Sequence, residues 1–102
     1  MDAQDDSVTA LLLASITVNG DGTDETLQGG ADDDTLRGAG GADLLEGFAG
    51  ADDLFGDDGQ DTLNGGDGDD ELFGGAGADV ASGGAGDDEV FGGSGDAASD
   101  TL

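Results

Sequence analysis

The chain has 102 residues, enough for one small domain, and its 26 acidic residues against a single basic residue, Arg37, give a formal net charge of −25. Such a charge excludes nucleic acid and anionic membranes as partners and points to cations. The lack of cysteine and histidine excludes disulfides and the usual zinc and transition-metal ligand sets, and 23 glycines make long helices unfavourable.

Residues 1–18 are an acidic leader followed by an apolar run from Val8 to Val18, and they contain no repeat. A secretory signal peptide would start with positive charge and end in a small-residue cleavage site, and this segment has neither feature. The run is also too short to cross a bilayer, so we expect no membrane insertion. We predict instead an N-terminal cap, with a short helix after Ser7 and a strand at Ile16–Val18, that covers the open end of the fold.

Residues 29–91 consist of seven consecutive nine-residue units without insertion or deletion. The first residue of every unit is glycine, the sixth is aspartate and the eighth is leucine, valine or alanine. A fixed period of this kind is typical of stacked repeats. The flanking segments are imperfect copies: residues 19–28 carry one extra residue, and residues 92–102 have Ala97 at the aspartate position.

Each position of the unit has a structural meaning. The glycines of the first six positions allow tight reversals with positive φ. The last three residues alternate outward, inward and outward, as in a short strand with one buried aliphatic side chain. One unit therefore makes half a coil. The sequence predicts an all-β fold over 19–102, a parallel β-roll (a two-sided β-solenoid) with 18 residues and two nonapeptides per coil.

Aspartates of alternate units are 18 residues apart, so they should form one row on each side of the roll. Neighbouring carboxylates repel unless a divalent ion lies between them. Calcium accepts mixed sets of six to eight carboxylate and carbonyl oxygens, which glycine-rich turns can supply. The rows predict about five calcium sites, with a sixth between Asp24 and Asp43 that depends on the extra residue, while Ala97 should abolish a site beyond Asp79. The rows are Asp34, Asp52, Asp70, Asp88 and Asp43, Asp61, Asp79.

The unit resembles the RTX (repeats-in-toxin) calcium-binding nonapeptide GGxGxDxUx, closely over 29–91 and loosely over 19–102. The resemblance implies a right-handed parallel β-roll with calcium between successive turns, bound by repeat aspartates and loop carbonyls. It also implies type I secretion and an extracellular or cell-surface location, where calcium drives folding. The implied ligands are Asp24, Asp34, Asp43, Asp52, Asp61, Asp70, Asp79 and Asp88, with Gly30, Gly41, Gly50, Gly59, Gly66, Gly68, Gly75, Gly77, Gly84 and Gly86.

This sequence departs from the motif at four turn positions. Asp32 replaces the fourth glycine of its unit, and Ala39, Phe48 and Asp57 replace the second glycine of theirs. We expect weaker or distorted turns at these places. Few residues follow the repeats, which puts an independent secretion segment in doubt.

A second pattern occupies the last position of alternate units, where the residues are 18 apart and should stack on one outer face. We expect an aromatic ladder that shields a thin sheet. The alternative is a docking stripe for a partner or for self-association. The chain could also self-associate by end-to-end contact of its coils. The residues are Arg37, Phe55, Phe73 and Phe91.

Other classes fit less well. An EF-hand is excluded because Leu72 stands where its loop requires glycine. We expect no enzyme, since histidine, cysteine and lysine are absent and regularly spaced carboxylates are better explained as ligands than as a glycosidase pair. A disordered acidic tail would not hold the aliphatic position in phase. Two functions remain: a calcium-dependent extracellular module used as stalk, spacer or assembly unit, or the C-terminal repeat tail of a type I-secreted enzyme or toxin, its covalent parent.

Overall fold

The computed structural model describes residues 7–9 and 17–93, and for residues 7–9 only the backbone. In this part of the chain there are ten strands and no helix, and most strands have three residues, as the last three positions of the unit predict. The strands are β1 (Ser7–Thr9), β2 (Thr17–Asn19), β3 (Thr26–Gln28), β4 (Thr35–Arg37), β5 (Leu44–Glu46), β6 (Asp53–Phe55), β7 (Thr62–Asp67), β8 (Glu71–Phe73), β9 (Val80–Ala85) and β10 (Glu89–Phe91).

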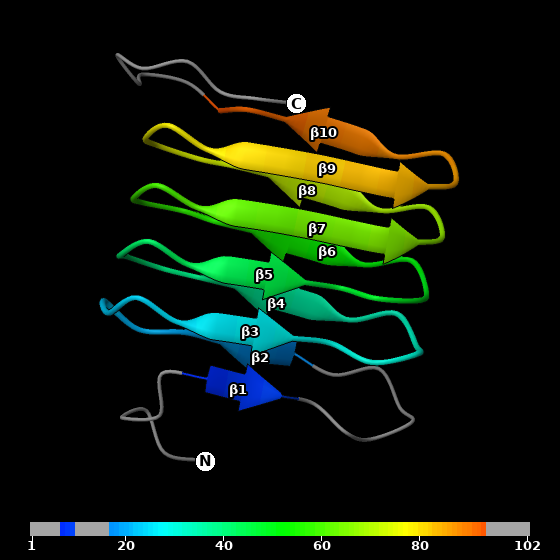
Figure 1. Cartoon of the computed structure of the whole chain (residues 1–102), viewed down its shortest axis with the longest axis horizontal. Coiled ribbons are helices and arrows are strands. Elements are labelled where there is room, and N and C mark those ends of the chain that lie inside the picture. The colour runs from blue at the N-terminus through cyan, green and yellow to red at the C-terminus, as the bar shows by residue number, and fades with distance from the viewer. Residues whose placement is uncertain (1–6, 10–16, 94–102) are drawn as a thin grey trace.

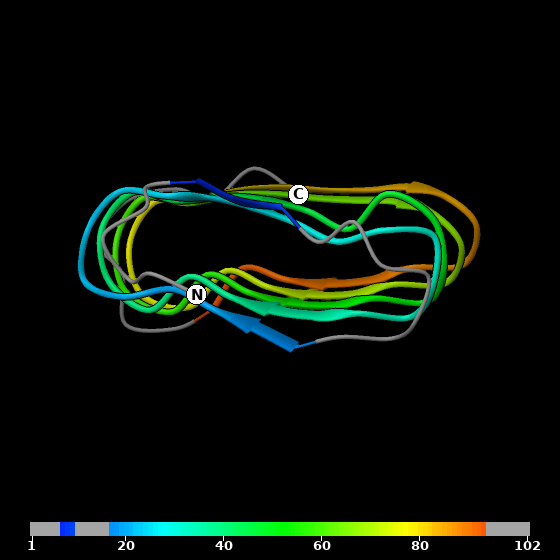
Figure 2. The same ribbon diagram turned by 90° about the horizontal axis from the view of Figure 1, so that it is seen from below.

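The strands form two parallel sheets, one with the order β1-β3-β5-β7-β9 and the other with the order β2-β4-β6-β8-β10. Consecutive strands lie in opposite sheets, so the chain winds from one sheet to the other and each coil lies on the one before (Figure 1). Figure 2 shows the coil as a flattened ring, with the sheets on its long sides and the turns at its short ends. The predicted parallel β-roll is therefore confirmed.

The strand register follows the period of the sequence. Leu36 pairs with Leu54 and Leu54 with Leu72, so the partners are 18 residues apart and two units close one coil. The strands form at these residues because threonine and phenylalanine favour the extended backbone, the central leucine is buried between the sheets, and glycine-rich turns bound each strand on both sides. β7 and β9 run three residues further than predicted, into the glycine turn, where Gly66 pairs with Gly84.

The first coil corrects three predictions. Asn19 is the last residue of β2, so residues 20–28 form a nine-residue unit with no extra residue and with Glu25 at the sixth position. The extra residue lies between β1 and β2, because Ser7 pairs with Thr26, 19 positions away. The strand predicted at Ile16–Val18 is Thr17–Asn19, and Ser7–Thr9 is a strand. The rest of the predicted helix, and Ala97, lie outside the described residues.

The core is one column of aliphatic side chains between the two sheets. Every strand from β2 to β9 points its second residue inward, and Val90 of β10 is partly buried against them. The leucines of this column are fully buried, so the narrow ring holds one side chain from each strand and no second layer. The buried residues are Val18, Leu27, Leu36, Leu45, Leu54, Leu63, Leu72 and Ala81.

The predicted ladder lies on the outer face of the even-numbered sheet. The rings of Phe55, Phe73 and Phe91 stack with 4.9 Å between neighbouring centroids and interplanar angles of 4° and 6°. The Arg37 guanidinium lies 4.4 Å from the centre of the Phe55 ring, a cation–π contact. The ladder is thus observed as a packing feature, and its use as a docking stripe stays a prediction. Among the described residues no helix is long and apolar enough to span a membrane.

Candidate metal centre

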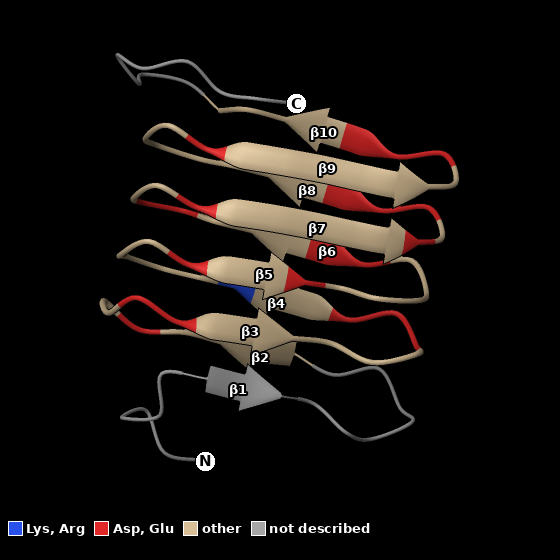
Figure 3. Cartoon of the chain, viewed as in Figure 1, with Lys and Arg blue, Asp and Glu red and all other residues tan. Residues whose placement is uncertain are grey.

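The acidic residues gather in the turns at both ends of the flattened coil (Figure 3). Each six-residue turn ends in the acidic sixth position, directly before a strand, so the strand register stacks these residues in two rows. The row that precedes the odd-numbered strands contains Glu25, at the position where the supposed extra residue predicted Asp24. The rows are Glu25, Asp43, Asp61, Asp79 and Asp34, Asp52, Asp70, Asp88.

Hydrogen bonds to the backbone connect the members of each row. The amide of Asp34 donates to Oδ1 of Asp52 at 2.7 Å, and the amide of Asp52 donates to Oδ1 of Asp70 at 2.8 Å. The other row repeats the pattern, with the Asp43 amide 2.9 Å from Oδ1 of Asp61. The sequence predicted that successive carboxylates face each other directly. They do not, because a backbone amide lies between them. One oxygen of each accepts a hydrogen bond from the preceding coil.

The second carboxylate oxygen has a different environment. In Asp43, Asp52, Asp61 and Asp70 the Oδ2 atom is buried and has no hydrogen-bond partner. A buried carboxylate oxygen without a partner is costly, and native structures seldom contain one unless an ion or water satisfies it. Four such atoms at equivalent positions indicate a shared cause.

These oxygens face the first glycine of their own unit, where a side chain is missing. A Cβ built on Gly38 would lie 2.5 Å from Oδ2 of Asp43 and 2.9 Å from the carbonyl oxygen of Gly56 in the next coil. On Gly56 the corresponding distances are 2.5 Å to Oδ2 of Asp61 and 2.6 Å to the carbonyl oxygen of Gly74. At these glycines one carboxylate oxygen and one carbonyl oxygen from the next coil thus converge on a place that no side chain could share, and we call this place the cradle.

The donor set of the cradle fits a hard cation. In the described part of the chain no three acidic side chains converge on a possible metal position, so a bound ion needs carbonyl ligands as well. Mixed carboxylate and carbonyl oxygens are the ligands that calcium prefers. Burial is the main cause that raises the pKa of Asp43 to about 6 and the pKa values of Asp52 and Asp61 to about 7, and nearby carboxylates add to it. A cation at the cradle would favour the ionised form.

The predicted glycine ligands also have a packing role, and their part in binding calcium stays a prediction. The second- and fourth-position glycines lie against the backbone of the preceding coil: a Cβ on Gly68 would collide with the carbonyl oxygen of Gly50, and one on Gly84 with that of Gly66. Glycine is needed there for close stacking. The carbonyls that line the cradles belong to first-position glycines, such as Gly56 and Gly74, and the glycine at the start of every unit was the available signal.

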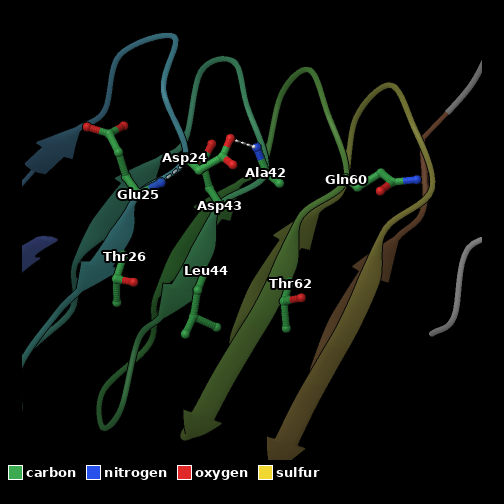
Figure 4. Close-up of a pocket in the computed structure, with 8 residues that line it drawn as sticks. All are labelled: Asp24, Glu25, Thr26, Ala42, Asp43, Leu44, Gln60 and Thr62. Carbon is green, nitrogen blue, oxygen red and sulfur yellow. Dashed lines mark hydrogen bonds between the residues drawn. The ribbon is translucent and has the colours of Figure 1, made fainter. Parts of the chain in front are cut away.

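Asp24 belongs to a separate ladder at the fifth position. Its Oδ1 accepts the amide of Ala42 at 2.8 Å, and Asp33 Oδ1 accepts that of Ala51 at 2.7 Å. Asp24 also lines a shallow hollow of about 400 Å³ beside β3, β5 and β7 (Figure 4). No first-position glycine lines this hollow, although Glu25 and Asp43 of the acidic row do. Its lining is Asp24, Glu25, Thr26, Ala42, Asp43, Leu44, Gln60 and Thr62.

The substituted second positions keep the backbone path of glycine. Ala39, Phe48 and Asp57 have φ values of 75°, 75° and 71°, in the left-handed region that L-residues rarely adopt. The expected distortion is therefore absent from these turns, which carry local strain instead.

Comparison with known proteins identifies the repeat. The family model of the RTX calcium-binding nonapeptide repeat matches four times, over residues 19–47, 28–63, 46–81 and 64–97. No curated protein and no solved structure matches the chain.

Proposed function

The chain belongs to the family of RTX calcium-binding nonapeptide repeats, and from that premise we propose that calcium ions occupy its cradles and hold successive coils together. Repeats of this family bind calcium, and the RTX β-roll is a structural repeat and not a catalytic fold. The proposal concerns which atoms of this chain bind the ion and what the ion does.

The observation that carries the proposal is the set of buried Oδ2 atoms without a partner. Oδ2 of Asp52 and Oδ2 of Asp70 each face a first-position glycine, together with a carbonyl oxygen of the next coil, Gly65 or Gly83. In these turns the repeat aspartate and the carbonyl of the first glycine one coil later would be the protein ligands. The bound ion would supply the positive charge that makes an ionised carboxylate tolerable in a buried position.

Calcium would thereby couple to folding. The aliphatic core is one side chain wide, and a net charge of −25 favours an expanded chain. A ligand that binds only the folded state stabilises it by mass action, so the free calcium concentration should set the folded fraction. We expect an apparent dissociation constant of about 10⁻⁴–10⁻³ M, the range of extracellular modules.

RTX repeats typically belong to secreted bacterial proteins, and an affinity in this range suits a calcium-rich exterior. We propose an extracellular or cell-surface, non-catalytic module, reached by the type I route, that serves as stalk, spacer or assembly unit. The second candidate is the C-terminal repeat tail of a secreted enzyme or toxin. It is favoured by the fact that the described residues consist almost wholly of repeat, since such a tail needs no other element.

Circular dichroism during a calcium titration tests the proposal. We expect the β-sheet signal to be absent in EGTA and to return with millimolar calcium. Magnesium at the same concentration should restore little of it, because magnesium demands a tighter octahedral ligand set. A β signal that is complete in chelator, or equal recovery with either ion, would contradict the proposal.

A further inference from the structure

The eight turns that the structure describes between β2 and β10 have two conformations. In six of them, from turn 38–43 onward, both the second and the fourth residue have positive φ; we name these the open turns. In turns 20–25 and 29–34 neither residue has positive φ, and we name these the closed turns. All eight turns have six residues, begin with glycine and end in an acidic residue, so the difference needs a cause.

The two conformations treat the acidic side chain differently. In closed turn 29–34 the amide of Gly30 donates to Oδ2 of Asp34 at 2.7 Å. In closed turn 20–25 the amide of Asp21 donates to Oε1 of Glu25, also at 2.7 Å. In the open turns that contain Asp43, Asp52, Asp61 and Asp70, the equivalent oxygen has no partner. A closed turn thus satisfies its own carboxylate, and the donated N–H directs its positive end at the oxygen that faces the cradle.

The second residue does not decide between the conformations. Gly30 could adopt positive φ without steric cost, yet it does not. Ala39, Phe48 and Asp57 adopt positive φ against the preference of L-residues. The state of the turn therefore does not depend on a glycine at the second position.

The fourth residue does separate the two classes. Every open turn has glycine there, with φ between 100° and 118°, for example Gly41 and Gly59. The closed turns have Thr23 and Asp32 instead. Threonine is β-branched and poorly suited to positive φ, and its amide and hydroxyl both donate to Oδ1 of Asp21, at 2.9 and 2.6 Å, which fixes turn 20–25 in its closed form.

We propose that the open turns bind calcium, that the closed turns satisfy their carboxylates with their own backbone and do not bind it, and that the fourth residue is the determinant. This inference rests on the calcium function proposed above. An N–H group and a divalent cation repel each other at the same oxygen. Calcium could therefore enter a closed turn only after the peptide group that carries the N–H of the second residue had rotated away. The chain then binds fewer ions than its rows of aspartates suggest, because Asp34 contributes no site. The coil of residues 20–37 is instead held by hydrogen bonds that need no metal.

Two matched pairs of variants test the inference by isothermal titration calorimetry, with circular dichroism in saturating calcium as the check on folding. Asp34→Asn and Asp52→Asn are the same substitution at the same position of one row, one coil apart. Asn keeps an oxygen that can accept the amide of the preceding coil, so the change mainly affects the cradle. We expect Asp34→Asn to keep the wild-type number of bound calcium ions and Asp52→Asn to lose at least one.

The second pair tests for a gain of binding. Asp32→Gly allows positive φ at the fourth position and should open turn 29–34, adding one calcium ion per chain although the chain loses a negative charge. Asp32→Ala removes the same charge without this freedom, and its calcium number should equal that of the wild type. No Asp32 atom lies among the nearest contacts of a first-position glycine, so a change in stoichiometry would report the state of the turn.

The outcomes separate this inference from the proposed function. If the wild type binds calcium but Asp34→Asn loses as many ions as Asp52→Asn, or if Asp32→Gly and Asp32→Ala bind the same number, the inference is wrong and the function stands. If the wild type binds no calcium, the proposed function itself is wrong.

Discussion

Gly40 and Gly41 are neighbours in one turn, and replacing each with alanine tests how closely the coils must stack. Gly41 has a φ of 100°, and a Cβ there would lie 2.8 Å from both the carbonyl carbon and the oxygen of Thr23 in the preceding coil. Both contacts are to backbone, which cannot rotate away. At Gly40 the nearest atom, the Cα of Gly22, is 3.5 Å away, an ordinary van der Waals contact.

The expected magnitudes follow from these contacts. Positive φ costs an L-residue about 1–2 kcal/mol, and forced crowding in a packed region costs about 1–3 kcal/mol more. The loss of unfolded-state freedom returns about 0.4–1 kcal/mol for any Gly→Ala change. Gly41→Ala should therefore destabilise the fold by roughly 3 kcal/mol, whereas Gly40→Ala should be neutral or stabilising by at most about 1 kcal/mol.

Urea unfolding followed by circular dichroism, at one fixed and saturating calcium concentration, measures the difference. With an m-value of about 1–3 kcal/mol/M, Gly41→Ala should lower the midpoint by ~1–3 M, and Gly40→Ala should leave it nearly unchanged. Holding free calcium constant is necessary because a bound ligand adds to the apparent stability. Equal midpoints for the two variants, or a larger loss for Gly40→Ala, would refute the stacking explanation.

Two further predictions concern the carboxylates and the ladder. In the folded chain the pKa of Asp43 is raised to about 6, and the pKa values of Asp52 and Asp61 are raised to about 7. Protonation of these groups therefore favours the calcium-free fold. Its stability should be greatest below about pH 4 and should fall as the pH rises through 6–7. Calcium-free protein should gain β signal by circular dichroism between pH 7.5 and pH 5, and a loss over this interval would contradict the burial of these groups. Phe73→Ala removes two ring contacts worth about 0.5–1.5 kcal/mol each and should lower the urea midpoint, while Phe48→Ala, at a side chain that is 47% exposed, should change it little. Equal effects of these two substitutions would show that the ladder adds no stability.

The regular body of the fold was predictable because one physical requirement determines the residue type at each position of the unit. The buried leucines from Leu36 to Leu72 and the pairing interval of 18 follow from the aliphatic eighth position, which has only one way to be buried in a two-sided coil. The first coil was harder to predict, since Asn19 resembles the start of a unit although it ends β2. That ambiguity shifted the acidic position from Glu25 to Asp24.

The chemistry of the turns was only partly predictable. The two rows of aspartates were predicted from the period. Their Oδ1 bonds to backbone amides were not, because the strand register decides where each peptide N–H lies and residue types alone do not encode that position. The carbonyls of Gly56 and Gly74 were missed for the same reason, since every residue carries a carbonyl. In the sequence, only Thr23 and Asp32 distinguish the two turn conformations. Their effect on φ becomes apparent only from the backbone of the structure.

The amide-to-carboxylate bonds give the stack a chemical direction. In the bonds to the sixth-position carboxylates the donor belongs to the earlier coil, as between Asp34 and Asp52, whereas in the bonds to the fifth-position carboxylates it belongs to the later coil, as between Ala42 and Asp24. A cut between two described coils would therefore expose N–H donors and carboxylate oxygens on both fragments, at exchanged positions of the turn. Donors and acceptors match position by position when the later fragment follows the earlier one, so fragments of this roll would rejoin head to tail.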